Sequence, residues 1–134
     1  MIIIRISKDT NMKEIKINKC NNLNLINNLK KNSISEGNHG IKLLFKWEYN
    51  KNNIECYGWY DGESGFENKH ELPPYGKSNF IDKDSSEELL FGDIFIIKKD
   101  LKNKLLDMKI SEYCDFYNFA MGGFEDCDIS TSED

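Results

Sequence analysis

The segment 41–60 constrains the fold more than any other part of this chain, because it has the pattern of two strands joined by a tight turn. Phe45, Trp47 and Tyr49 alternate with charged residues, which is the two-residue period of a strand with one buried face. The turn-forming run Asn-Lys-Asn-Asn occupies 50–53, and a second β-rich run follows it. The sequence therefore predicts a hairpin with an aromatic stripe, which we expect to pack in the core.

The rest of the chain predicts a second hairpin, a third β pair and two helices. The expected elements are strands over 1–7 and 14–20, a helix over 22–31, strands over 92–100 and 101–109, and a helix that opens at Ser111 and ends at Gly122-Gly123. We predict an α+β fold with a mostly antiparallel sheet of three β pairs and two helices packed on one face, in the order β-β-α-β-β-loop-β-β-α.

The net charge of −5 is located at one end of the chain. Residues 125–134 contain five acids and no Lys or Arg, which leaves 18 acidic and 18 basic residues in 1–124. Only one basic residue, Arg5, is an arginine. Contacts from Lys and Arg to phosphate supply most of the affinity for duplex DNA, so the neutral body argues against duplex binding. We predict a single domain over 1–124 followed by an acidic, disordered tail over 125–134.

We next consider metal binding and cellular location, which depend on the cysteines, the histidines and the apolar runs. The four cysteines and two histidines show no spacing typical of a metal site, so neither a metal nor a cofactor is predicted. The apolar run at the N-terminus ends at Arg5, and the run over 89–97 is interrupted by Gly92-Asp93. These interruptions indicate neither a signal peptide nor a membrane span. We therefore expect an intracellular protein with reduced thiols and no membrane partner.

The segment 61–88 is predicted to be a long loop, because it lacks periodicity and contains both prolines. Loops of this length are uncommon in compact domains and often bind something. Its first part carries a dense cluster of side chains of the kind found in catalytic sites, Asp61, Glu63, Glu67, His70 and Glu71. One hypothesis is a small acid–base or metal-dependent hydrolase that uses this cluster, with His70 titrating near neutral pH. The other interpretation is a solvated polar connection, which the absence of known catalytic spacings favours.

Two segments have the chemistry of a protein-docking surface. Leu72-Pro73-Pro74-Tyr75 is a proline–aromatic element of the kind that docks in grooves, although such elements also stiffen loops. In the tail, the aromatic Phe124 precedes Glu125, Asp126 and Asp128, a pattern that suits a basic groove on a partner. We therefore predict a non-enzymatic protein-interaction module that docks a partner through its long loop and its acidic tail.

A third hypothesis is single-stranded nucleic-acid binding, because exposed aromatic rings can stack on bases. The candidate rings are Trp47, Tyr49, Trp59 and Tyr60. This hypothesis requires the rings to face solvent beside lysines.

Several motifs follow one another between residues 41 and 128. They are Cys56-Tyr57-Gly58-Trp59, Gly62, Gly65, the run 67–74 (ENKHELPP), Gly92-Asp93-Ile94, Phe116-Tyr117 and Gly122-Gly123-Phe124-Glu125-Asp126. In this order the chain resembles an uncharacterised acidic-tailed protein family of nucleocytoplasmic large (giant) DNA viruses, mimivirus-like. The composition, with 16 Asn, 16 Ile and 17 Lys, fits an AT-rich genome. The resemblance implies a viral or host protein partner and a location in the host cytoplasm, the viral factory or the virion, and it implies no catalytic residues.

The first 40 residues carry none of these motifs. Their predicted hairpin and helix, followed by a strand from Ile41, are similar to the beginning of ubiquitin-like β-grasp domains. This similarity concerns the fold and implies no function.

Overall fold

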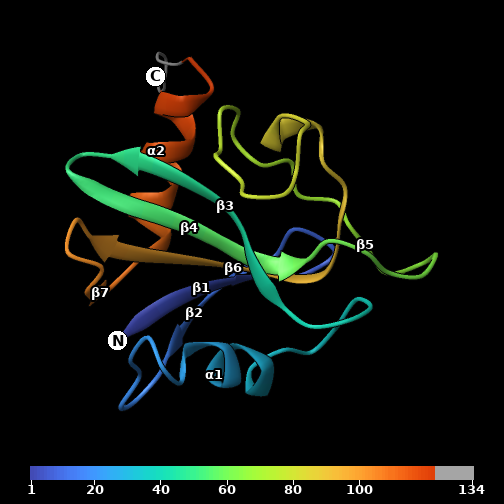
Figure 1. The fold of residues 1–134 in the computed structure, drawn as a ribbon, viewed down its shortest axis with the longest axis horizontal. Helices are drawn as coiled ribbons and strands as arrows, with labels where there is room; N and C mark the ends of the chain where they lie inside the picture. The colour runs from blue at the N-terminus through green and yellow to red at the C-terminus, as the bar shows by residue number, and fades with distance from the viewer. Residues whose placement is uncertain (123–134) are drawn as a thin grey trace.

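The computed structural model describes residues 1–122 and shows a mainly antiparallel sheet with two helices (Figure 1). The elements are β1 (Ile2–Ile6), β2 (Met12–Lys16), α1 (Leu25–Lys31), β3 (Lys42–Tyr49), β4 (Asn52–Trp59), β5 (Glu67–Asn68), the 3-10 turn η1 (Ser85–Glu87), β6 (Leu90–Asp100), β7 (Leu105–Leu106) and α2 (Ile110–Ala120). The predicted α+β class and the three β pairs, β1–β2, β3–β4 and β6–β7, are confirmed. The predicted tail lies outside the described residues.

The sheet has the strand order β2-β1-β6-β4-β3, and each of these pairs is antiparallel. The longest strand, β6, lies at the centre, and β5 and β7 each pair with part of it. The β3–β4 turn is shorter than the predicted turn over 50–53. Asn50 and Lys51 take positive φ angles of 52° and 64°, which close a two-residue turn and let β4 begin at Asn52.

The two helices cover opposite faces of the sheet, which differs from the prediction that both lie on one face. Ile94 and Ile96 pack in the cluster that contains the buried side chains of α2. Phe95 and Ile97 pack in the cluster that contains the buried side chains of α1. Because β6 is apolar on both sides, each face of the sheet needs its own cover.

The segment 61–88 is anchored to the face that α2 covers. Leu72 and Ile81 are buried in the same cluster as the α2 side chains. Lys77 and Lys46 exchange backbone hydrogen bonds of 2.9 and 2.8 Å, so the loop pairs with the outer edge of β3. This segment therefore forms one wall of the molecule, and Figure 1 shows it beside β3 at the upper right.

Candidate protein-docking site

A groove of about 390 Å³ lies between the edge of β3, the loop around Tyr75 and the C-terminal half of α2. We call it the β3–α2 groove. Its lining residues are Lys46, Trp47, Glu48, Pro74, Tyr75, Lys77, Phe116, Phe119 and Ala120. Most of these side chains are aromatic or aliphatic, and two are lysines. A concave apolar surface with a few charged groups at its edge is typical of a recognition site.

Tyr75 is the most exposed aromatic side chain of the groove, with 80% of its surface accessible. Its φ angle is +69°, a left-handed conformation that bulky residues rarely adopt. Two hydrogen bonds hold this conformation, from the Tyr75 N–H to Asp84 Oδ1 and from the Gly76 N–H to Ser85 Oγ, both 2.9 Å long. The loop therefore holds an aromatic ring in solvent at the cost of backbone strain, which is common at functional sites.

Asp84 also organises the loop that follows Tyr75. A hydrogen bond from the Ser86 hydroxyl, together with the N–H groups of Tyr75 and Ser86, lowers the pKa of the Asp84 carboxyl. The ionised carboxylate of Asp84 is therefore the form that stabilises the loop around Tyr75.

The wall of the groove is joined to its floor through Trp47. The indole Nε1–H of Trp47 donates a 2.9 Å hydrogen bond to the carbonyl of Pro74. On its other side, Trp47 packs edge-on against Phe116 with ring centroids 5.7 Å apart. Gly76 allows this close approach, because a Cβ atom there would lie 2.8 Å from Cζ2 of Trp47. The loop, β3 and α2 thus form one packed unit around the groove.

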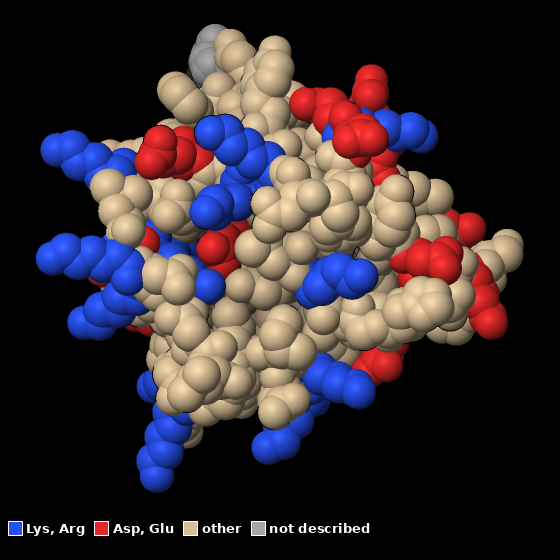
Figure 2. Space-filling model, viewed as in Figure 1, with Lys and Arg blue, Asp and Glu red and all other residues tan. Residues whose placement is uncertain are grey.

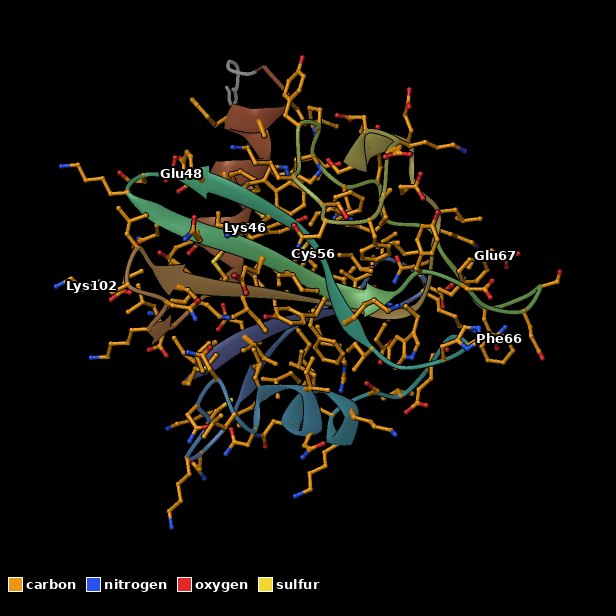
Figure 3. All side chains as sticks on the ribbon, viewed as in Figure 1. Lys46, Glu48, Cys56, Phe66, Glu67 and Lys102 are labelled. Atoms are coloured by element: carbon orange, nitrogen blue, oxygen red, sulfur yellow. The ribbon has the colours of Figure 1, made fainter. Side chains whose placement is uncertain are left out.

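Two exposed lysines, Lys46 and Lys77, line the groove. Neither forms an ion pair with a carboxylate within residues 1–122. A second hollow of about 520 Å³ shares Lys46, Trp47, Glu48 and Lys77 with the groove. Figure 3 shows Lys46 and Glu48 on β3, and Figure 2 shows basic side chains gathered on the side of the β3–β4 turn. A concave path that carries Lys46 and Lys77 therefore runs along the edge of β3.

The side chain of His70 contacts α2 and not the carboxylates of the predicted 61–71 cluster. His70 Nε2 is 2.8 Å from the hydroxyl of Tyr113, and its ring packs against Tyr117. Burial lowers the pKa of His70 to about 4. The imidazole is therefore neutral at pH 7 and forms part of the packing between the loop and α2.

The four carboxylates of the predicted cluster occupy separate positions. Asp61 Oδ2 lies 3.7 Å from His39 Nε2. Glu67 Oε1 accepts a 2.8 Å hydrogen bond from the Gly65 N–H, and the Glu63 side chain is exposed. At Glu71, the backbone carbonyl accepts the Tyr117 hydroxyl at 2.7 Å. Within residues 1–122, no group of three or more His, Cys, Asp or Glu side chains could hold a metal ion. The structure does not bring the predicted cluster together.

The predicted stacking aromatics are mostly covered. Trp47 is 5% exposed and Trp59 is 1% exposed, and the two pack in clusters on opposite faces of the sheet. Tyr49 is half-buried, with its ring centroid 5.1 Å from that of Phe119. Of the four rings, Tyr60 alone is exposed. These residues do not form a common stacking platform.

The predicted docking motif Leu72-Pro73-Pro74-Tyr75 is divided by the fold. Leu72 is 1% exposed and Pro73 is buried, so both anchor the loop to the core. Pro74 and Tyr75 line the groove. The other predicted docking residues, Phe124, Glu125, Asp126 and Asp128, lie outside the described residues.

Sequence reasoning missed Phe119, which is 65% exposed in the groove. The signal was its position, because Phe119 falls outside the apolar face formed by Tyr113, Phe116 and Tyr117. An aromatic residue on the polar side of an amphipathic helix is a candidate contact residue.

A buried polar cluster lies on the other face of the sheet. Lys99 Nζ lies 3.0 Å from Glu55 Oε1, and the Tyr57 hydroxyl donates a 2.8 Å hydrogen bond to the same oxygen. Burial, together with the charge of Glu55, raises the pKa of Tyr57 well above its usual value. The three groups satisfy one another, so we interpret the cluster as structural.

Comparisons with known proteins do not assign a function to this chain, so the function is inferred from the geometry of the groove. No family model, curated protein or solved structure matches the chain. Among residues 1–122, no helix has the length and apolar content needed to cross a membrane.

Proposed function

We propose that this chain is a non-enzymatic protein-interaction module whose docking surface is the β3–α2 groove. The observation that carries the proposal is Tyr75, whose side chain is 80% exposed and whose backbone is held in a strained conformation by hydrogen bonds. Interface energy is concentrated in exposed aromatic anchors of this kind, and a backbone that is already held in place loses less entropy on binding.

The lining of the groove indicates the chemistry of the partner. Trp47, Phe116 and Phe119 offer aromatic surface, and Lys46 and Lys77 offer positive charge. This combination suits a protein segment with an aromatic or aliphatic anchor flanked by acidic residues. The acidic residues 125–134 of the chain would add a second contact, on a basic surface of the same partner. The giant-virus resemblance favours a viral or host protein as that partner.

The hydrolase hypothesis has less support than docking. General acid–base catalysis requires a titratable group within reach of a reacting group. The His70 imidazole is hydrogen-bonded to Tyr113, and its pKa is lowered to about 4. Stacking on nucleic acid has equally little support, since Trp47 and Trp59 are buried.

The test begins with capture of partners from infected or host cells with the full chain, followed by titration of each purified partner. We expect Tyr75→Ala and Phe119→Ala each to weaken the partner's Kd at least about tenfold, as central interface anchors do. The matched control is Leu23→Ala, because Leu23 is 96% exposed and precedes α1, which covers the opposite face. An unchanged Kd for both groove variants would contradict the proposal.

The contribution of the tail needs a separate comparison. A chain without residues 125–134 should recover less of the same partner, since it lacks five acids. Equal recovery would remove the tail from the docking surface and leave the groove as the remaining claim.

A further inference from the structure

We infer that residues 123–134 of this chain occupy the β3–α2 groove when no partner is bound, so that a partner must displace them. The inference rests on the proposed function, because both use the same groove. It assigns to that groove an intramolecular ligand and therefore a means of regulation.

The exit of the chain from α2 is the first argument. Phe119 and Ala120 belong to the last turn of α2, and both line the groove. Gly122 then takes a φ of +90°, and its N–H donates a 3.1 Å hydrogen bond to the carbonyl of Phe119. A left-handed residue at this position ends a helix and turns the chain away from the helix axis. The last described residue, Gly122, is therefore only two residues beyond Ala120, which lines the groove.

The length of the segment is sufficient. Twelve residues follow Gly122, and Phe124 is the second of them. An extended chain spans up to about 3.5 Å per residue, or roughly 40 Å for this segment. The chain is therefore long enough for Phe124, four residues after Ala120, to contact the aromatic part of the groove and for the acids that follow it to contact the lysines along β3.

The chemistry of the segment complements the groove. Phe119 and Met121 are exposed apolar side chains beside the point of exit, and Phe124 supplies an aromatic partner for them. Five acids follow Phe124 without a Lys or Arg among them. Lys46 and Lys77 are unpaired within residues 1–122, and Glu48 is the carboxylate that lines the same groove. Two cations against one anion give the groove a positive balance.

The tether makes weak binding sufficient. A segment joined to its site by a short linker has an effective concentration in the mM range. A groove affinity of about 1 mM therefore already keeps the segment bound about half of the time. A partner with the same chemistry competes with it, and half occupancy of the groove weakens the partner's apparent Kd by about twofold. Removing residues 125–134 relieves this competition and also removes their own contact with the partner, which we take as the larger effect, so partner recovery still decreases.

The test uses the indole N–H resonances of the two tryptophans in the full chain, labelled with ¹⁵N. Trp47 lines the groove and donates its Nε1–H to Pro74, whereas Trp59 is buried on the other face. We expect Phe124→Ala to move the Trp47 resonance and to leave the Trp59 resonance unchanged. Neutralising the five acids to amides should move Trp47 in the same direction. The matched control is Glu63→Gln, an exposed acid on the 61–88 loop, which should move neither resonance.

The outcomes separate the possible occupants. Identical Trp47 resonances in the wild type, Phe124→Ala and the neutralised chain would overturn the inference. A difference that appears only as the protein concentration rises would overturn it as well, because it would assign the groove to a second copy. If Trp47 does not respond but Tyr75→Ala still weakens the partner, the inference fails and the proposed function stands. If Trp47 responds but Tyr75→Ala and Phe119→Ala leave the partner's Kd unchanged, the proposed function fails alone.

Discussion

At the residue scale, the structure contains polar groups whose burial has to be compensated. Lys99 is 6% exposed and Glu55 is 4% exposed, and each is the other's charge partner. A buried pair of this kind contributes little compared with an apolar pair, but removing one member leaves an uncompensated charge. Glu55 therefore stabilises the fold mainly by neutralising the Lys99 ammonium group, which would otherwise be an isolated charge in the core.

The Glu55→Ala variant tests this interpretation. We expect the free energy of unfolding to fall by about 3 to 5 kcal/mol, because Lys99 stays buried without its partner. Urea denaturation measures the change. Glu48→Ala is the matched control, because Glu48 is exposed on the adjacent strand β3 and its removal should cost less than about 0.5 kcal/mol. Equal stability of the two variants would show that Lys99 and Glu55 are not coupled in the folded protein.

His70 gives the structure a specific dependence on pH. Burial lowers its pKa from 6.5 to about 4, so folding favours the neutral imidazole. The stability linked to His70 is complete above about pH 6.5 and is lost as the pH falls from there towards 4, where the folded protein also takes up the proton. The full difference is at most about 3 kcal/mol, at 1.36 kcal/mol per pKa unit.

The measurement compares urea unfolding of the wild type and His70→Phe from about pH 7 to about pH 4. The wild type should lose more stability on acidification than the variant does. Leu23→Ala, which alters an exposed side chain without a titratable group, should keep the wild-type slope. NMR titration of the His70 ring in the wild type should give a midpoint well below 6.5. A midpoint at 6.5 would mean that the ring is not packed as described.

At the element scale, Gly92 joins β6 to the segment between α1 and β3. Its φ angle is +67°, and a Cβ atom there would lie 2.6 Å from the carbonyl oxygen of Ser35. The next residue, Asp93, accepts the N–H groups of Ile34 and Ser35 at 2.7 and 3.3 Å. The long connection after α1 is therefore fixed to the central strand at this point.

Gly92→Ala should destabilise the fold by more than about 1 kcal/mol, because it adds both backbone strain and a clash with backbone atoms. Thermal or urea unfolding measures the effect. Gly40→Ala is the control, because nothing lies within 4 Å of a Cβ atom at that position, and its φ is not in the left-handed range. We expect Gly40→Ala to be neutral or slightly stabilising. Similar costs for the two variants would contradict the assigned role of Gly92.

The elements were predictable where the pattern was local. The alternation of Phe45, Trp47 and Tyr49 predicted the β3–β4 hairpin, and the spacing of Tyr113 and Phe116 predicted α2. The two-residue strand β5 carries too few residues for a periodic signal, and β7, predicted over 101–109, covers only Leu105–Leu106. The start of α2 was predicted at Ser111 and lies one residue earlier, at Ile110. Glu112 accepts the Lys109 N–H at 3.2 Å and so caps this helix without Ser111.

The candidate site was only partly predictable. Pro74 and Tyr75 were predicted as contacts, but burial of Leu72 and Pro73 depends on how the loop folds over the sheet. The groove itself combines residues 46–48, 74–77 and 116–120, which are far apart in the sequence. The groove therefore depends on packing between segments that are distant in sequence, and local sequence patterns do not predict it.

At the scale of the whole molecule, the two faces of the sheet have different roles. One face is closed by α1 and contains the buried cluster of Glu55, Tyr57 and Lys99. The other face is covered by α2 and the 61–88 segment, and the groove opens along this side. The order of the strands was not predictable from local pattern, because β6 pairs with β1, from which it is separated by most of the sequence. The continuous apolar run of β6 did contain the signal for two covered faces.

Residues 1–122 are neutral, and the whole net charge of −5 follows the last turn of α2. We propose that this charge binds either the lysines of the groove or a partner, and both proposals depend on the surface beside Tyr75.

Photo-crosslinking from position 75 tests this claim most directly. A photoreactive phenylalanine replaces Tyr75 in the full chain, and the same residue at position 23 serves as the control on the opposite side of the molecule. We predict that position 75 crosslinks to residues 123–134 in the isolated protein and to the partner in cells, and that position 23 gives neither product. Equal yields from positions 75 and 23 would contradict the docking role of the β3–α2 groove.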